Sequence, residues 1–172
     1  MLTAVLAIGA AGLLVYAALH DLAARTVPNW LPIALLLLGL CARLSDHTLF
    51  SGLIVAGCTF VVLFVIWLLG AMGGGDVKLW AATVLLIPPL LQPELDFFLR
   101  VVVFGGVLAV LYLSLGLFVS KPKGAHGGGL LRRLLRAEAW RISKRAPRAP
   151  LPYACAIASG AIVTLLPLSL QR

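Results

Sequence analysis

The sequence predicts an all-α fold: a polytopic integral membrane bundle of about six transmembrane helices. Apolar residues make up 62% of its 172 residues and charged residues only 12%, against about 45–50% and about 25% in ordinary soluble domains. A soluble domain of this length could not bury so much apolar surface, so lipid must surround most of the chain. At about 20 residues per span, the length allows at most about eight spans.

Apolar stretches alternate with short polar segments along the whole chain. The first stretch lacks a basic start and a small-residue cleavage site, so we interpret it as a retained span rather than a secretory signal. The 77–91 stretch is short and is interrupted by Pro88 and Pro89, which break helical continuity. The expected spans cover residues 2–19, 30–43, 50–71, 77–91, 97–119 and 151–169.

The distribution of basic residues predicts the orientation. The net charge is +8, and placing the amino terminus outside leaves only Arg43, Arg100 and Arg172 of the fourteen lysines and arginines on the outer side. Cytoplasmic loops are enriched in such residues, so both termini should be periplasmic in a multi-pass protein of the bacterial inner membrane. We expect a single domain, 1–172, whose long basic cytoplasmic loop at about 121–150 binds anionic lipid rather than a partner protein. Nucleic-acid binding is not expected.

Two of the six acidic residues stand out. Of the other four, Asp46, Glu94 and Asp96 fall in expected outer loops and Glu138 falls in the basic loop. Contact with solvent is enough to account for a charged side chain at these positions. Asp21 instead follows the first span and Asp76 precedes the fourth, on the same predicted face. Two neighbouring carboxylates share a proton, and such a pair can supply a base for water and an acid for a carbonyl oxygen. Alternatively, each caps a helix or pairs with Arg25 or Lys78.

The residues around the aspartates have structural roles of their own. Gly73, Gly74 and Gly75 precede Asp76 and allow a tight turn or the close approach of another chain. After Asp21 and Arg25, Pro28 should end the first helix. Asn29 should then cap the second helix.

Taken together, these segments resemble a known family. Asp21 with Arg25, Pro28 and Asn29 resembles the first aspartate motif of the type IV prepilin peptidases. The segment 73–79, GGGDVKL, is similar to their GxGD-x-K-L motif, and 151–158, LPYACAIA, to the "P-Y-x-x-A" opening of their last span. The resemblance covers essentially the whole chain, and the length is most similar to the compact peptidases of tight-adherence (Flp-type) pilus systems.

The resemblance implies an aspartic membrane endopeptidase that removes a short basic leader from prepilins at the cytoplasmic face. The implied catalytic pair is Asp21 and Asp76, supported by the motif residues Gly73, Gly75, Lys78, Arg25, Pro28 and Asn29, and the implied partner is a prepilin helix. Larger members add an N-terminal methyltransferase region with a cysteine-bound zinc. This chain begins at its first span and has no CxxC pair among Cys41, Cys58 and Cys155, so N-methylation is not expected.

Two further classes of function stay open at this point. A small ion- or proton-coupled transporter could use the same aspartates, and a non-catalytic subunit of a secretion system would need neither. The three histidines, His20, His47 and His126, lack the spacing of metal ligands, so no metal or other cofactor is expected. The oligomeric state is not predicted.

Overall fold

The computed structural model describes residues 2–118 and 152–170, and all regular structure within them is helical. This confirms the all-α prediction. The helices of the described residues are α1 (Leu2–Ala24), α2 (Trp30–Ser45), α3 (Leu49–Leu68), α4 (Gly74–Val84), α5 (Leu91–Phe118) and α7 (Tyr153–Leu170).

The chain divides into two compact units. The first consists of Met1–Gly105 with Pro152–Arg172, and the second is Gly106–Leu151. The second unit contributes only the end of α5 to the described residues, and the expected basic loop at about 121–150 lies outside them.

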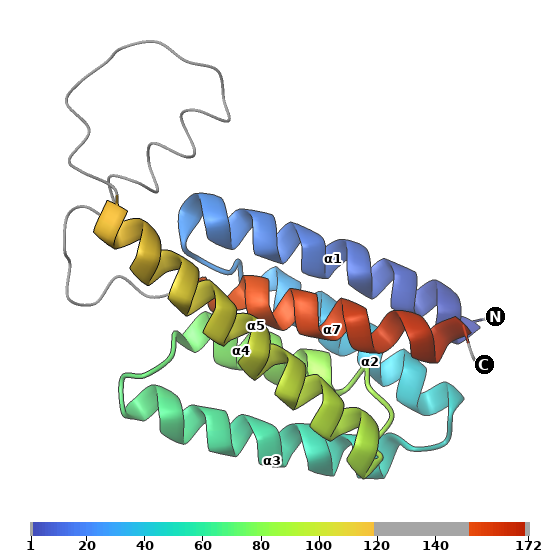
Figure 1. The fold of residues 1–172 in the computed structure, drawn as a ribbon. Coiled ribbons are helices and arrows are strands. Elements are labelled where there is room, and N and C mark those ends of the chain that lie inside the picture. The colour runs from blue at the N-terminus through green and yellow to red at the C-terminus, as the bar shows by residue number, and fades with distance from the viewer. Residues whose placement is uncertain (1, 119–151, 171–172) are drawn as a thin grey trace. The chain divides into compact units, whose positions relative to one another are not determined.

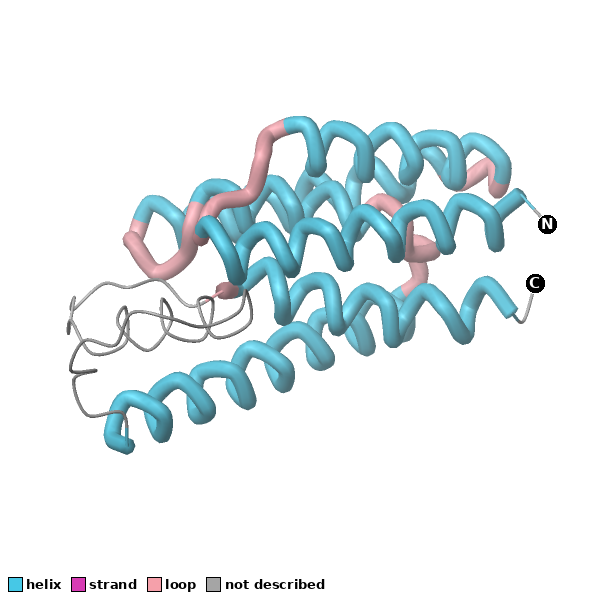
Figure 2. Tube along the Cα trace, turned by 90° about the horizontal axis from the view of Figure 1, so that it is seen from above, coloured by secondary structure: helices cyan, strands magenta, loops and turns pink. Residues whose placement is uncertain are grey.

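Successive helices of the first unit run in alternating directions (Figure 1), and a view from above shows the helices lying side by side (Figure 2). One end of this unit, which we call the aspartate end, contains the last residues of α1 and α3 and the first residues of α2, α4 and α7. The first residue of α1 and the last of α7 lie at the opposite end.

Three helical segments are long and apolar enough to cross a membrane: Ala4–Ala24, Leu49–Leu68 and Leu91–Ser114. Two shorter apolar segments, Trp30–Ser45 and Tyr153–Leu168, accompany them. Large apolar side chains are exposed on these helices, including Val5 at 65% and Phe50 at 80%. Such continuous apolar exposure is unusual in water but expected against lipid. The chain is an integral membrane protein.

The helix α4 differs from the expected span 77–91. It begins earlier, at Gly74, and ends at Val84, after only 11 residues. The following segment up to Leu90 is not helical, yet Leu85, Leu86 and Ile87 are at most 5% exposed. Non-helical backbone is tolerated at membrane depth only where protein covers it, and α4 packs against α2, α3 and α7. The two prolines explain why the helix does not continue.

A buried arginine stabilises this non-helical segment. Arg43, at the end of α2, is only 2% exposed, and its Nη2 donates to the Leu86 carbonyl oxygen at 3.5 Å. The same guanidinium lies 3.2 Å from Asp46 Oδ2 and donates to Thr48 Oγ1 at 3.3 Å. The expectation that solvent alone accounts for the charge of Asp46 is therefore wrong, because Asp46 pairs with Arg43. They connect the turn between α2 and α3 to the turn between α4 and α5.

The sequence also predicted an outer loop at 92–96, between the spans 77–91 and 97–119. This prediction is wrong, because these residues form the first turns of α5. Pro93 is compatible with a helix there, since the first turn has backbone N–H groups without intrahelical partners. Glu94 and Asp96 are therefore helical residues.

Small side chains allow α1 and α7 to pack closely. Ala10 and Ala17 of α1 and Ala154 and Ala161 of α7 are all fully buried, and α7 packs against α1 over much of its length. Small residues at an interface let two membrane helices approach each other closely.

Candidate active site

Both aspartates singled out in the sequence lie at the aspartate end and are buried. Asp21 is in the last turn of α1 and is 6% exposed, while Asp76 is in the first turn of α4 and is 8% exposed. Asp21 belongs to the helix rather than to the loop after it, because α1 continues to Ala24. Aspartates are rarely buried to this degree unless neighbouring groups compensate their charge or a proton neutralises them.

The backbone before Asp76 places its carboxylate back over the start of α4. Gly73 is the N-cap residue in an extended conformation, and its backbone N–H donates a hydrogen bond to the Asp76 side chain. This is the reverse half of a capping box, in which the third helical residue bonds the N-cap N–H. A Cβ atom on residue 73 would lie 2.8 Å from Asp76 Oδ2. Glycine is needed there because any side chain would displace the carboxylate.

The electrostatics of the site come from burial and from the second aspartate. Asp76 lies in none of the long apolar spans. Burial, followed by the negative charge of Asp21, raises the pKa of the Asp76 carboxyl from 3.8 to about 7, and the hydrogen bond from Gly73 opposes this rise. The two carboxyl groups are thus close enough to repel each other, although they are 55 positions apart in the chain (76 − 21). Near neutral pH, a proton can remain on the pair.

The turn between α1 and α2 brings the first motif against the second. Arg25 adopts a left-handed conformation, with φ 57°, and its N–H bonds the Asp21 carbonyl oxygen at 2.8 Å. This closes the end of α1 as a left-handed C-terminal residue usually does. The His20 ring nitrogen Nδ1 lies 2.7 Å from the Thr26 carbonyl oxygen across the turn. The helix α1 therefore ends at Ala24, one residue before Arg25.

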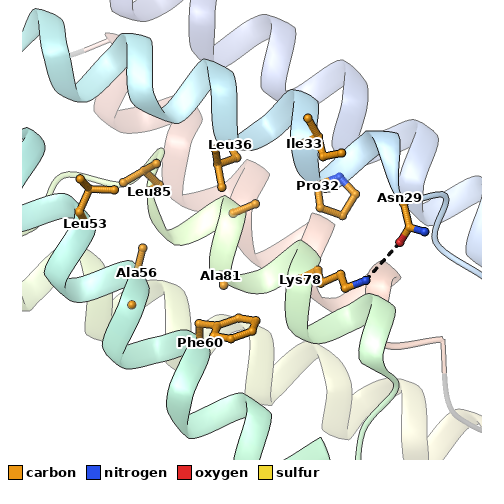
Figure 3. Close-up of a pocket in the computed structure, with 12 residues that line it drawn as sticks. Asn29, Pro32, Ile33, Leu36, Leu53, Ala56, Phe60, Lys78, Ala81 and Leu85 are labelled. Carbon is orange, nitrogen blue, oxygen red and sulfur yellow. Dashed lines mark hydrogen bonds between the residues drawn. The ribbon is translucent and has the colours of Figure 1, made fainter.

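Val27 and Asn29 make the contacts between the two motifs. A Cβ atom on Gly75 would lie 3.2 Å from Val27 Cβ, so the glycine that directly precedes Asp76 permits a close approach of the turn. Asn29 occupies the N-cap position of α2 but makes no capping hydrogen bond. Its Oδ1 instead accepts a hydrogen bond from Lys78 Nζ at 3.4 Å (Figure 3). The expected capping role of Asn29 is therefore wrong, and Lys78 bonds this neutral amide.

The third motif is at the start of α7, beside α1. Pro152 is fully buried and Tyr153 begins the helix. The Cys155 thiol donates to the Ala18 carbonyl oxygen at 3.4 Å, one turn before Asp21. This motif therefore supports the helix that holds Asp21.

Sequence reasoning missed Val27 and Trp67. A Cβ atom on Gly74 would lie 3.2 Å from Trp67 Nε1 of α3, so the glycine run is enclosed from two sides. Trp67 stands in an apolar stretch and Val27 in the polar segment 25–29, and no motif in the sequence marks either of them. In the described part of the chain, no three His, Cys, Asp or Glu residues form a group that could hold a metal ion.

Comparison with known proteins agrees with the motifs. The profile of the type IV leader peptidase family matches residues 8–129. The chain is 32% identical over 158 residues to the prepilin leader peptidase/N-methyltransferase of Bacillus subtilis (strain 168), over 90% of this chain and 52% of that protein. The chain thus spans about half the length of this curated relative. No solved structure matches it significantly. The chain belongs to the type IV leader peptidase family.

Proposed function

We propose that the chain is a membrane aspartic endopeptidase that removes the short basic leader of type IV-like prepilins. The observation that supports this most directly is the juxtaposition of Asp21 and Asp76, two buried carboxyl groups from different helices whose charges interact. Membership of the family adds the substrate class, since the curated relative is named a prepilin leader peptidase.

The pair would hydrolyse the peptide bond by shared acid and base catalysis. One carboxylate, in the charged form, removes a proton from a water molecule, which attacks the carbonyl carbon of the scissile bond. The other carboxyl group, still protonated, donates to the carbonyl oxygen. A shared proton near neutral pH is the state that this chemistry needs. Because the two groups are coupled, they titrate as a pair rather than singly.

The other motif residues would position this pair. Gly73 leaves room for the Asp76 carboxylate, and Gly75 leaves room for the turn that follows Asp21. Arg25 and Pro28 shape this turn, and Lys78 joins it to α4 through Asn29.

Cleavage would occur at the cytoplasmic face of the inner membrane, with both termini periplasmic. The distribution of lysine and arginine along the chain supports this orientation. The arrangement of the helices is compatible with it, since the start of α1 and the end of α7 lie opposite the aspartate end. The whole chain would act as one peptidase domain, with the basic loop at about 121–150 on anionic lipid.

This chain would remove the leader without methylating the new amino terminus. Its three cysteines, at positions 41, 58 and 155, form no CxxC pair that could bind the zinc of a methyltransferase region. Mass spectrometry of the processed pilin would distinguish a free from a methylated amino terminus.

The decisive experiment combines the purified protein in nanodiscs with candidate prepilins. Asp21→Asn and Asp76→Asn should each lower the cleavage rate by at least about 100-fold, which is the usual contribution of a general acid or base. Asp96→Asn is the matched control, because it removes a carboxylate of α5 outside the aspartate end. Normal cleavage by either aspartate variant, folded and inserted, would refute the assignment.

A further inference from the structure

A groove lies between α2 and α3, with α4 as its floor (Figure 3). Its volume is about 560 Å³, within the range of about 300–1,000 Å³ typical of ligand sites. The floor consists of one face of α4: Lys78, Ala81, Ala82 and Leu85, which follow each other at helical spacing. The walls are mostly aliphatic side chains of α2 and α3, with Phe60 near the end that contains Lys78.

This groove is not a continuation of the aspartate pair. Asp76 and Lys78 are two positions apart on α4, and residues at that spacing do not share a helix face. Asp76 interacts with Asp21 of α1, whereas Lys78 lines the groove and bonds Asn29 at the start of α2. A peptide bond held at the carboxylates would therefore lie on the other side of α4, and the groove has room for a different occupant.

One end of the groove is polar and the rest is apolar. Lys78 and Asn29 are at this end, and no carboxylate is among the described residues that line the groove. A lysine ammonium makes its strongest hydrogen bonds with anions, but its partner here is the neutral amide oxygen of Asn29. The neighbouring Trp30 is 50% exposed, as is common at the headgroup level of a membrane.

The groove opens towards the hydrocarbon. Ile33 on its α2 wall is 59% exposed and Leu53 on its α3 wall is 47% exposed. An occupant must therefore combine an anionic group at the headgroup level with an apolar chain below it. An anionic phospholipid has this chemistry.

We infer that the groove binds one anionic phospholipid, with its phosphate at Lys78 and Asn29 and an acyl chain along Ala81, Ala82 and Leu85. The bound phosphate bridges the start of α2 to the first turns of α4. The lipid thereby stabilises the turn on which Asp76 is placed. This site lies among the described helices and is separate from the basic loop at about 121–150.

The test measures lipid retention by native mass spectrometry, with phosphatidylglycerol and phosphatidylcholine as probes. The wild-type protein should retain one phosphatidylglycerol at concentrations at which phosphatidylcholine is lost. Lys78→Gln should weaken this retention about tenfold, the usual effect of losing one charge-assisted hydrogen bond, and Lys78→Arg should largely restore it. Gly57→Leu should also weaken retention by filling the groove, because a Cβ atom on Gly57 has no neighbour within 4 Å.

Gly9→Leu is the matched control for the larger side chain, since Gly9 also has open space around it but lies on α1. It should retain phosphatidylglycerol as the wild type does, and thermal unfolding confirms that each variant is folded. Unchanged retention in Lys78→Gln or in Gly57→Leu would overturn the inference. Loss of prepilin cleavage in Gly57→Leu with unchanged lipid retention would assign the groove to the substrate helix instead. Lipid retention needs no catalysis, so this result is independent of the proposed peptidase activity.

Discussion

Asp76→Asn should make the protein more stable while it removes activity. The folded protein holds a proton on the coupled pair, through the raised pKa of Asp76, up to about pH 7, whereas Asp76 in the unfolded chain releases its proton near 3.8. The folded state therefore binds more protons between these values, and its stability falls as the pH rises from about 3.8 to about 7. Asparagine resembles the neutral carboxyl group at every pH and has no such loss.

The size of the effect follows from the two pKa values. The difference between 3.8 and about 7, at about 1.4 kcal/mol for each pH unit, corresponds to roughly 4 kcal/mol above pH 7. About half of it, roughly 2–3 kcal/mol, should develop between about pH 5 and pH 8. The cause is the cost of a charge on Asp76 beside Asp21 in a buried site, which the neutral amide avoids.

The assay is reversible unfolding in mixed micelles at several pH values between about 5 and 8, the window in which the loss develops. The free energy of unfolding of Asp76→Asn should exceed that of the wild type by an amount that grows with pH. Asp96→Asn shows the effect of removing a carboxylate of α5 outside the site. A difference that does not change with pH, or a variant less stable than the wild type at the alkaline end, would refute the reasoning.

Two further substitutions test the geometry around the site and the broken helix. Gly73→Ala should lower kcat by at least about tenfold, because its methyl group would lie 2.8 Å from Asp76 Oδ2. Gly12→Ala, where a Cβ atom has open space, should leave the cleavage rate unchanged, and equal rates for both variants would contradict the role of Gly73. Arg43→Met should reduce the free energy of unfolding by about 1.5–3 kcal/mol, since it removes hydrogen bonds to a charged group and the ion pair with Asp46. Thermal unfolding measures this loss, Arg43→Lys should recover part of it, and an unchanged midpoint would show that the arginine is dispensable.

The sequence was most informative where hydrophobic pattern and local chemistry agree. Long apolar stretches predicted α1, α3 and α5, because an uninterrupted run of that length is typical of a membrane span in a chain this apolar. The placement of Asp21 and Asp76 at the same end follows from the alternation of spans, since an even number of crossings separates the end of the first span from the start of the fourth. Their burial and mutual repulsion agree with the reasoning that set them apart from the other acids.

The parts that sequence reasoning missed depend on contacts between distant segments. Nothing local to Arg43 indicates that it bonds the Leu86 carbonyl oxygen, which is 43 positions away. Asn29 has the residue type and the position of a helix cap, but Lys78 competes for its side chain. The end of α4 at Val84 also depends on tertiary packing, because only the surrounding helices allow apolar residues to leave a helix without exposing their backbone to lipid.

The shortness of α4 has a consequence for how the protein is assembled in the membrane. Eleven residues rise only about 16 Å, roughly half of the hydrocarbon thickness, and the backbone beyond them needs protein partners. This segment cannot partition into the bilayer as an independent helix during synthesis. It must insert in contact with α2 and α3, which precede it in the chain. The surface of α4 that packs against α7 can be covered only later, when α7 is inserted. The packing around α4 is therefore complete only after α7 has been inserted, and the proposed peptidase site would form at that stage.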